Sequence, residues 1–341
     1  MKYTVAGIAM VLSMCANVAC AQQDAVPRPP PGPAEFRPAR AVPPVAPAVN
    51  EMVDVALREE AQRIIETLAT DRNFNIRANA VETAQKNLPP AVSRPIAIRG
   101  FSDEAPVVRF AAAVAAGDLK LQDTKPVLLK LAYDTDPSVR LAARYALHRL
   151  GDSTLTQEML YGLRDDRAGV RGNTVMLLGM LGEKSAIAPI RRIITDRSPT
   201  VRLQLHEALW RLGERQSVEE LVIFSMSKFP DEQVVSLIAL AQPRDQRVTE
   251  QLSGWLVDDF PEVTLAAARG LGMLGSDEGY GVAMRFIKSK EPRQRAMAAL
   301  ALGEIGRIDA QSRLKPLLAD PSADVRLAAA SAVLKLRPPR K

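Results

Sequence analysis

A phrase of about 31 residues recurs nine times from Met52 onward, and it constrains the fold more than any other feature of the chain. Each repeat is marked by a residue, usually Arg, that nearly always follows Val or Ile. The markers are Arg77, Arg109, Arg140, Arg171, Arg202, Val235, Thr264, Arg295 and Arg326, at spacings of 32, 31, 31, 31, 33, 29, 31 and 31 residues. A fixed period of this length predicts a solenoid, in which each repeat packs only on its neighbours.

Three other positions of the phrase direct the backbone. Pro stands three residues before the marker in five repeats, and Gly stands eleven residues after it in five. Because proline suits the first position of a helix and glycine suits its left-handed end, we predict a helix B between them. A shorter apolar helix A precedes it. Six residues before the marker, Asp stands in seven repeats: Asp71, Asp103, Asp134, Asp165, Asp196, Asp258 and Asp320.

Composition agrees with a helical chain. Aromatic residues make up only 4% of the sequence, while the helix formers Ala and Leu are abundant. Strands are therefore expected to be few. The formal net charge of +6 is spread over 45 basic and 39 acidic residues, which predicts only a weak general attraction to anionic surfaces.

The repeat resembles a known family. The phrase Asp-Thr-Asp-Pro-Ser-Val-Arg-Leu-Ala-Ala-Arg-Tyr-Ala-Leu-His-Arg-Leu-Gly, at positions 134–151, is similar to HEAT repeats of the short, phycobilisome-lyase type. The resemblance extends from about Met52 to Arg337 and implies an all-α, right-handed α-solenoid of about nine two-helix HEAT-like repeats over residues 52–338. It also implies that the recurring Asp and Arg tie each A–B turn to the neighbouring repeats. Function is left open, since the family includes scaffolds, lyase components and a hydroxylase.

Repeats 6 and 7 depart from the pattern. Val235 and Thr264 replace the marker Arg, and Phe229 stands where repeat 6 should have Asp. Pro243 falls where helix B of repeat 6 is expected to continue. We expect the polar ladder to be interrupted here, which would allow a change of curvature or a hinge.

The N-terminus has the features of an export signal. A basic residue, an uncharged run and small residues predict a signal segment at residues 1–21, cleaved after Ala21. The alternative is a lipid anchor at Cys20. No other contact with a membrane is expected. Residues 22–51 form a Pro-rich spacer. Both cysteines, Cys15 and Cys20, precede the cleavage site, so the remainder has no thiol chemistry. We therefore expect a periplasmic or secreted protein, or a lipid-anchored envelope protein.

The sequence offers little for catalysis. Only two histidines occur, and no glycine-rich phosphate loop is present. The hydroxylase relatives hold two irons with several His-Glu pairs, whereas this chain has one such pair, His206-Glu207. We therefore expect no catalytic residues, no metal and no cofactor. An enzyme or cofactor-handling protein resembling the lyase or hydroxylase remains the alternative. Nucleic acid is not expected as a partner, because the charge is mild and stacking aromatics are few.

A binding face follows from the helical period of helix B. The side opposite its core is expected to line a concave groove, and this side carries apolar residues one and five positions after the marker. The first row is Phe110, Leu141, Leu203, Leu265 and Leu327; the second is Val114, Tyr145, Met176, Leu240 and Leu300. These rows either contact a partner or pack between adjacent repeats. Nine positions after the marker lies a mostly basic row, Lys86, Arg149, Arg211, Arg244 and Lys335, interrupted by Asp118 and Glu304.

The candidate site for a protein or peptide partner lies in repeats 3 to 5. Two polar and aromatic walls are expected to flank a floor with flexible methionines and with no side chain at Gly179. The alternative is that Trp210 packs against a neighbouring repeat and that the histidines have no role. The walls consist of Arg144, Tyr145, His148 and Arg149 in repeat 3 and His206, Glu207, Trp210 and Arg211 in repeat 5; the floor contains Met176 and Met180.

Overall fold

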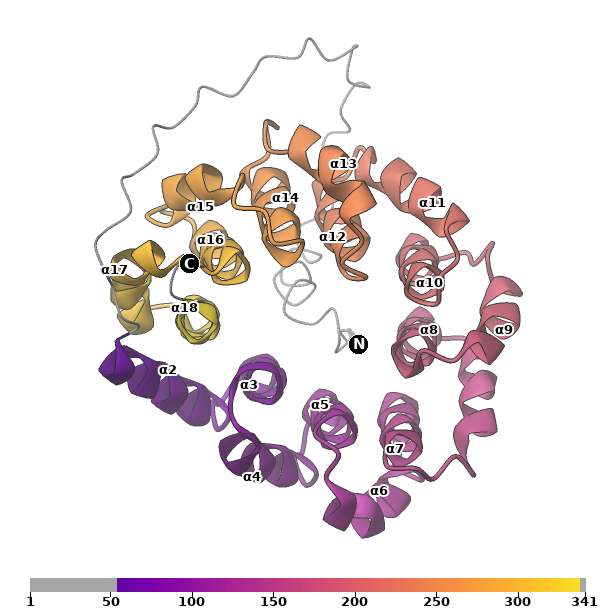
Figure 1. Cartoon of the computed structure of the whole chain (residues 1–341). Helices are drawn as coiled ribbons and strands as arrows, with labels where there is room; N and C mark the ends of the chain where they lie inside the picture. The colour runs from indigo at the N-terminus through magenta and orange to yellow at the C-terminus, as the bar shows by residue number, and fades with distance from the viewer. Residues whose placement is uncertain (1–53, 338–341) are drawn as a thin grey trace. The chain divides into compact units, whose positions relative to one another are not determined.

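The computed structural model describes residues 54–337, in two compact units. One unit is residues 65–221, and the other combines residues 54–64 with residues 222–337. The predicted signal segment, the Pro-rich spacer and Cys20 lie outside the described residues. The described chain contains no β-strand, only an isolated bridge between Arg307 and Arg337. The predicted fold class, an all-α, right-handed α-solenoid, is confirmed (Figure 1).

Residues 65–221 contain repeats 1 to 5, apart from the start of the first helix. In each repeat a shorter A element precedes a longer B helix. The elements are α2 (Val55–Leu68), α3 (Phe74–Asn87), α4 (Pro90–Gly100), α5 (Pro106–Asp118), α6 (Lys125–Leu131), α7 (Pro137–Arg149), the 3-10 helix η2 (Thr156–Arg164), α8 (Ala168–Leu181), α9 (Ile187–Arg191) and α10 (Pro199–Arg211).

The second unit contains repeats 6 to 9. The unit boundary falls within α11, Gln216–Ser225, which is the A helix of repeat 6. The following elements are α12 (Pro230–Ala241), α13 (Thr249–Gly254), α14 (Pro261–Met273), α15 (Tyr280–Phe286), α16 (Pro292–Ile305), α17 (Gln311–Leu314), the 3-10 helix η6 (Lys315–Ala319) and α18 (Ala323–Lys335).

The start of α2 packs on the last repeat within this second unit. The amide of Asp54 donates to Gln311 Oε1 at 2.9 Å, and the Arg58 guanidinium donates to the carbonyl of Leu336 at 2.8 Å. Arg337 N–H in turn donates to the carbonyl of Gly306 at 2.9 Å. Within this unit, the start of α2 therefore packs against the last repeat.

The backbone reasons for the repeat are confirmed at both ends of helix B. Pro occupies the first turn of α5, α7, α10, α12, α14 and α16. In seven repeats the backbone turns left-handed, with positive φ, eleven residues after the marker. Glycine fills this position five times, at Gly151, Gly182, Gly213, Gly275 and Gly306, and Lys120 and Arg244 adopt the same conformation without being glycine.

The marker of repeat 6 is Gln233, so the prediction of Val235 was wrong by two residues. In α12 the amide of Gln233 donates to the carbonyl of Phe229, as each marker amide does to the residue four before it. Arg244 lies eleven residues later, at the left-handed position. The spacings around repeat 6 are thus 31 and 31 residues, and Pro243 follows the helix instead of interrupting it. Repeat 6 lacks the marker Arg, the turn Asp and the glycine, and its register was therefore predicted incorrectly from the sequence.

Successive B helices approach one another closely because small residues meet at their contacts. A Cβ at Gly179 of α8 would lie 2.9 Å from Ala208 Cα in α10. A Cβ at Gly303 of α16 would lie 2.6 Å from Ala332 Cα in α18. No side chain fits at either position without a shift of the backbone. Gly179 therefore belongs to a helix contact, and the predicted open floor at that position is absent.

Candidate functional site

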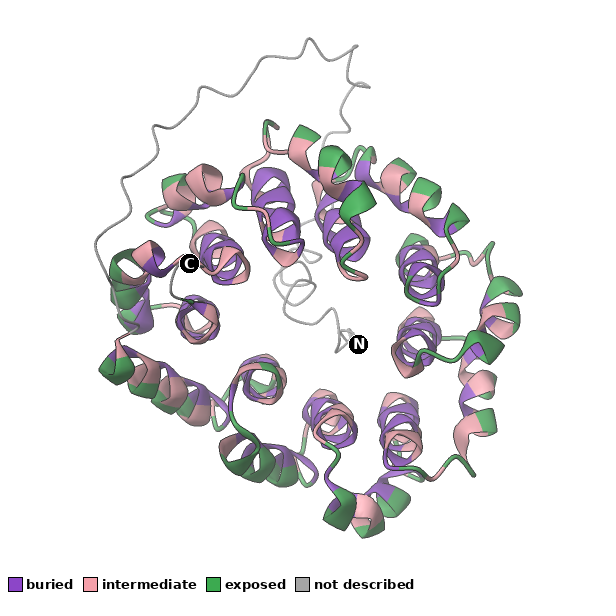
Figure 2. Ribbon diagram, viewed as in Figure 1, coloured by how far each residue is buried: buried purple, intermediate pink, exposed green. Residues whose placement is uncertain are grey.

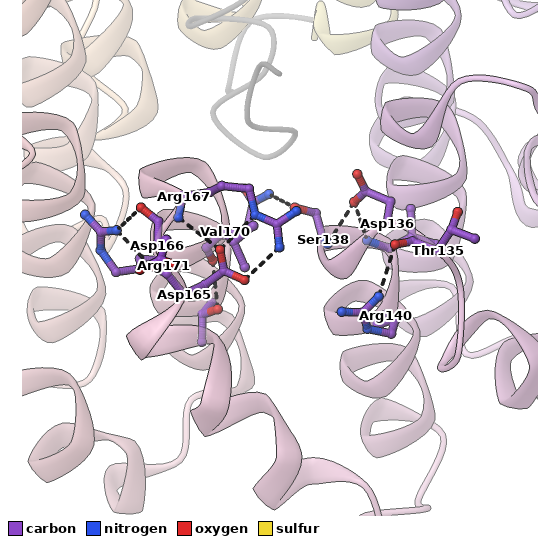
Figure 3. A network of polar contacts seen from close by, with 12 residues as sticks. Thr135, Asp136, Ser138, Arg140, Asp165, Asp166, Arg167, Val170 and Arg171 are labelled. Atoms are coloured by element: carbon purple, nitrogen blue, oxygen red, sulfur yellow. Dashed lines mark hydrogen bonds and ion pairs between the residues drawn. The ribbon is translucent and has the colours of Figure 1, made fainter. Parts of the chain in front are cut away.

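A ladder of arginine–aspartate pairs links the A–B turns of neighbouring repeats. The marker Arg of one repeat donates two hydrogen bonds to the Asp of the next, as Arg171 does to Asp196 at 2.6 and 2.8 Å. Its third nitrogen donates to carbonyls of its own turn, those of Asp165 and Asp166 (Figure 3). The other pairs are Arg77–Asp103, Arg109–Asp134 and Arg295–Asp320. The structural role implied by the family resemblance is confirmed for these residues.

The ladder carboxylates are held in their ionised form. Hydrogen bonds from Arg171 lower the pKa of Asp196. Burial opposes ionisation of Asp103 and Asp134, but the arginine and backbone hydrogen bonds outweigh it and lower the pKa of both groups. Each carboxylate also accepts an amide of its own turn, as Asp196 does from Ser198 at 2.9 Å. One Asp thus fixes a local turn and a contact between repeats.

One step of the ladder is built differently. Arg140 bonds the carbonyls of its own turn, Asp134 and Thr135, at 2.8 and 3.2 Å. Asp165 of the next repeat is instead held by Arg167, which precedes α8 and whose side chain is 60% exposed (Figure 3). The ladder is thus looser between repeats 3 and 4 than at its other steps in residues 65–221.

Five of the predicted partner-binding residues are buried. Their exposures are 1% for Tyr145, 8% for Met176, 6% for His206, 7% for Glu207 and 5% for Trp210. The interpretation that these side chains form open walls is wrong, because each B helix is enclosed by its neighbours over most of its circumference. Burial also disfavours the charged imidazole and lowers the pKa of His206.

The apolar rows on helix B are also buried. Leu141, Leu203 and Leu265 are 2%, 3% and 0% exposed. Phe110 and Leu327 are equally covered, at 2% and 0%. Of the two explanations left open by the sequence, packing between repeats therefore holds for this row. Leu240 and Arg244 leave their predicted rows altogether once Gln233 becomes the marker.

Two residues of the predicted first wall bind the next repeat. Arg144 pairs with Glu158 of η2 at 2.7 Å. His148 contacts Thr156 Oγ1 through Nδ1 at 2.8 Å and Glu183 through Nε2 at 2.9 Å. These contacts connect α7 to η2 and to the turn after α8, so Arg144 and His148 stabilise the stacking of repeats 3 and 4.

A polar cluster on the B-helix face of residues 65–221 keeps two arginine side chains partly exposed. Tyr145 donates its hydroxyl to Asp118 Oδ1 at 2.5 Å, and Arg149 Nε lies 3.7 Å from the same oxygen. Arg211 bonds Glu207 at 2.9 Å. The side chains of Arg149 and Arg211 are 33% and 30% exposed. We call these four residues, Asp118, Tyr145, Arg149 and Arg211, the B-face cluster.

Burial dominates the electrostatics of this cluster. It raises the pKa of Asp118 despite the hydrogen bond from Tyr145 and the positive charge of Arg149. Burial also raises the pKa of Tyr145, whereas the positive charges of Arg149 and Arg211 act to lower it. The sequence signalled Asp118 only as an interruption of a basic row, whereas it is the acceptor around which the cluster forms.

No group of three or more His, Cys, Asp or Glu side chains within residues 54–337 is arranged to hold a metal ion. No helix in this part of the chain is long and apolar enough to cross a membrane.

Comparison with known proteins gives one family match. A profile of HEAT repeats matches residues 61–148, 156–241 and 249–335. No curated protein matches the chain. Among solved structures, the complex of CpcE and CpcF of phycocyanin lyase from Nostoc sp. PCC7120 is 20% identical over 74% of this chain and 97% of that one, with a TM-score of 0.44. Human deoxyhypusine hydroxylase is 18% identical over 73% and 97%, with a TM-score of 0.37.

Proposed function

Because this chain belongs to the HEAT-repeat family, we propose that it is an exported, non-catalytic scaffold that binds a protein or peptide partner. The proposed site is the B-face cluster of residues 65–221, together with Met180. It replaces the wider groove expected from the sequence, since five of the residues proposed for that groove are buried; of these five, Tyr145 stays in the site as a buried member of the cluster.

One observation carries the proposal. Arg149 and Arg211 occupy the same register position of helix B, nine residues after the marker, in repeats 3 and 5. Their side chains stay about one-third exposed, at 33% and 30%, although each has a carboxylate nearby. Arginine is enriched among the residues that dominate binding energy at protein interfaces. Two guanidinium groups in this setting suit a partner segment that carries carboxylates.

The surroundings of the two arginines are pre-organised. Tyr145 and Trp210 are buried in the repeats that carry Arg149 and Arg211, so they fix the helices from which the arginines project. Met180 occupies the same register position in repeat 4, which comes between repeats 3 and 5, and its side chain is partly exposed. A flexible thioether at this position can adapt to different partner side chains.

Site-directed photo-crosslinking tests this function. A photoreactive amino acid at position 180 should capture one dominant protein from the native host, whereas the same group at Lys184, on the following turn, should not. Once the partner is identified, Arg149→Glu with Arg211→Glu should weaken binding by about 2 kcal/mol, roughly thirtyfold. The charge-matched control is Lys184→Glu with Arg215→Glu, two exposed cations outside the cluster.

Trp210 is left unchanged in this design because its burial would turn the test into one of folding. An unchanged affinity in the Arg149/Arg211 variant, with helical circular dichroism preserved, would show that the cluster does not bind the partner. An equal loss in the control variant would assign the effect to net charge.

Export is supported by the residues before position 22. The uncharged run followed by Ala19-Cys20-Ala21 predicts a mature chain that begins at Gln22. Intact mass of the protein recovered from the cell envelope measures this directly. An acylated Cys20 would establish the lipid-anchored alternative, and a full-length species confined to the cytoplasm would exclude export.

A further inference from the structure

The A elements of residues 65–221 present a regular row of exposed side chains on the opposite side of the repeats. Ten residues before the marker, four successive repeats carry Arg99, Lys130, Tyr161 and Arg192. They lie on α4, on α6, on η2 and directly after α9, and all four are exposed. Figure 2 shows the exposed sides of α4, α6 and α9 turned away from the B helices. Because the four residues occupy the same register position in consecutive repeats, they lie next to one another on one face.

Large apolar side chains are interleaved with this row. Tyr133 is 71% exposed and Tyr161 is 77% exposed. Ile98 and Leu129 directly precede Arg99 and Lys130, at 36% and 44% exposure. Ile194, three residues after the end of α9, is 43% exposed. Each A element from α4 to α9 thus exposes an aromatic or aliphatic side chain beside a cation, since Arg164 follows Tyr161 on η2. We call this surface the A-face.

The cations of the A-face have no acidic partners. Among the described residues, Arg99, Lys130, Arg164 and Arg192 form no ion pair. The carboxylates on the same elements are engaged elsewhere: Asp123 pairs with Arg94, and Glu158 pairs with Arg144 of α7. The remaining exposed acids nearby, Glu104 and Asp166, lie in the A–B turns. A strip of positive charge therefore extends over four repeats of residues 65–221.

We propose that the A-face docks this protein onto a bilayer surface that contains anionic phospholipids. Phosphate groups on a bilayer form a two-dimensional array, which suits cations repeated once per repeat and held in no pocket. Each Lys or Arg close to such a surface favours binding by roughly fivefold. Tyrosine concentrates at membrane interfaces, and Leu and Ile gain by entering the acyl boundary. The A-face is distinct from the B-face cluster, so a docked protein keeps its proposed partner site accessible.

Vesicle co-sedimentation of the full chain tests the proposal. Vesicles of phosphatidylcholine alone are compared with vesicles that also contain phosphatidylglycerol. The N-terminal residues are the same in the parent and in every variant, so any attachment through them is common to all. The parent should prefer the anionic vesicles, and this preference should decrease as salt rises.

Three charge reversals locate the binding surface. Arg99→Glu, Lys130→Glu and Arg192→Glu together should lower partitioning onto anionic vesicles at least about tenfold. The matched control reverses Lys120, Lys184 and Arg215, which are exposed cations in the B–A connections of the same unit. Its net charge changes equally, and it should retain most of the binding.

The tyrosines provide a second readout that does not depend on charge. Tyr133→Ser with Tyr161→Ser should weaken binding roughly fivefold in raised salt, where the apolar contribution dominates. Circular dichroism must remain helical in all variants. The proposal is overturned if the parent shows no preference for anionic vesicles, or if both triple variants lose binding equally. An A-face that bound an acidic protein but no vesicles would overturn it as well.

Discussion

Residues 65–221 and residues 222–337 are built from the same repeat, but they differ in their polar connections. The first region has three Arg–Asp rungs, Arg77–Asp103, Arg109–Asp134 and Arg171–Asp196. Within residues 222–337 the structure shows one such rung, Arg295–Asp320. Gln233 and Thr264 stand at the marker in repeats 6 and 7, so Asp258 has no arginine to accept from.

What both regions share is the backbone geometry. Where repeats 6 and 8 lack the turn Asp, Ser227 and Ser289 accept the amides of Phe229 and Glu291, both at 3.2 Å. Proline begins helix B in both regions. The close helix contact also recurs, as Gly179 against Ala208 and as Gly303 against Ala332. The period is therefore set by the turn, the proline and the small residues, while the Arg–Asp rungs add stability to a geometry that forms without them.

The largest expected effect comes from removing one rung. Asp196→Asn keeps an acceptor for the Ser198 amide but leaves Arg171 without its carboxylate, in a pair whose side chains are 7% and 6% exposed. Leaving a buried charge unpaired should destabilise the fold by about 3 kcal/mol, measured by chemical unfolding.

Asp258→Asn is the matched change in the second region. Asp258 makes the same turn contact, with the amide of Phe260 at 2.8 Å, but no rung. Its substitution should cost less than about 1 kcal/mol. Equal losses at Asp196 and Asp258 would mean that the aspartates act only through the turn.

The close helix contact should be equally sensitive in the two regions. Gly179→Ala and Gly303→Ala each force a Cβ against a backbone Cα, at 2.9 and 2.6 Å. Each should cost about 2 kcal/mol by overpacking. Gly254→Ala is the control, because no atom lies within 4 Å of a Cβ there. It should be neutral or slightly stabilising.

A missing rung can be added by one substitution. Gln233→Arg places an arginine at the marker of repeat 6, opposite the unpaired Asp258 of repeat 7. We expect stabilisation by about 1 kcal/mol. The gain should vanish when Asp258→Asn is combined with it, which a double-mutant cycle measures directly. A gain that survives this second change would have another origin.

Acidification should weaken the first region more than the second. The pKa values of Asp103, Asp134 and Asp196 are lowered by their arginines, as is that of Asp320. A lowered pKa stabilises the fold above the unfolded-state value of about 3.9, and this contribution is lost as the pH falls through the folded-state values. Three of these carboxylates lie in residues 65–221. Amide exchange at a series of pH values below 5 should show the difference.

Asp118 should behave in the opposite direction. Burial raises its pKa, so its ionisation opposes folding, and this cost grows as the pH rises through the folded-state value. Asp118→Asn can still accept from the Tyr145 hydroxyl and carries no charge. It should flatten the pH dependence of the free energy of unfolding between the unfolded-state value of about 3.9 and the higher folded-state value. An unchanged profile would show that Asp118 titrates as in the unfolded chain.

The sequence was sufficient for the fold because the repeat is encoded by backbone rules. The prolines, the glycines and the 31-residue period located helix B in eight repeats. The prediction was wrong in repeat 6, because Gln233, Ser227 and Arg244 stand where the marker Arg, the turn Asp and the glycine are expected. Lys120 and Arg244 adopt the left-handed conformation although they are not glycine, so glycine does not mark the end of every helix B.

The candidate site was predicted less well than the fold. Helical periodicity correctly brought Tyr145, Arg149 and Arg211 to related positions, but it could not decide how much of helix B its neighbours cover. Trp210 and Leu203 are buried because small residues let adjacent B helices approach closely. That approach depends on pairs such as Gly179 with Ala208. The two residues of a pair belong to different repeats, so the sequence of a single repeat does not reveal the contact.

The rungs should make residues 65–221 the more stable of two geometrically similar regions. Native-state amide exchange of α8 and α12 tests it most directly, because α8 carries Arg171 of an intact rung and α12 carries Gln233. Exchange should be slower in α8, and the segment from Phe229 to Arg247 should open at lower free energy than repeats 3 to 5. Gln233→Arg should then slow exchange in α12 specifically. Uniform protection across both helices, unchanged by that substitution, would contradict the claim.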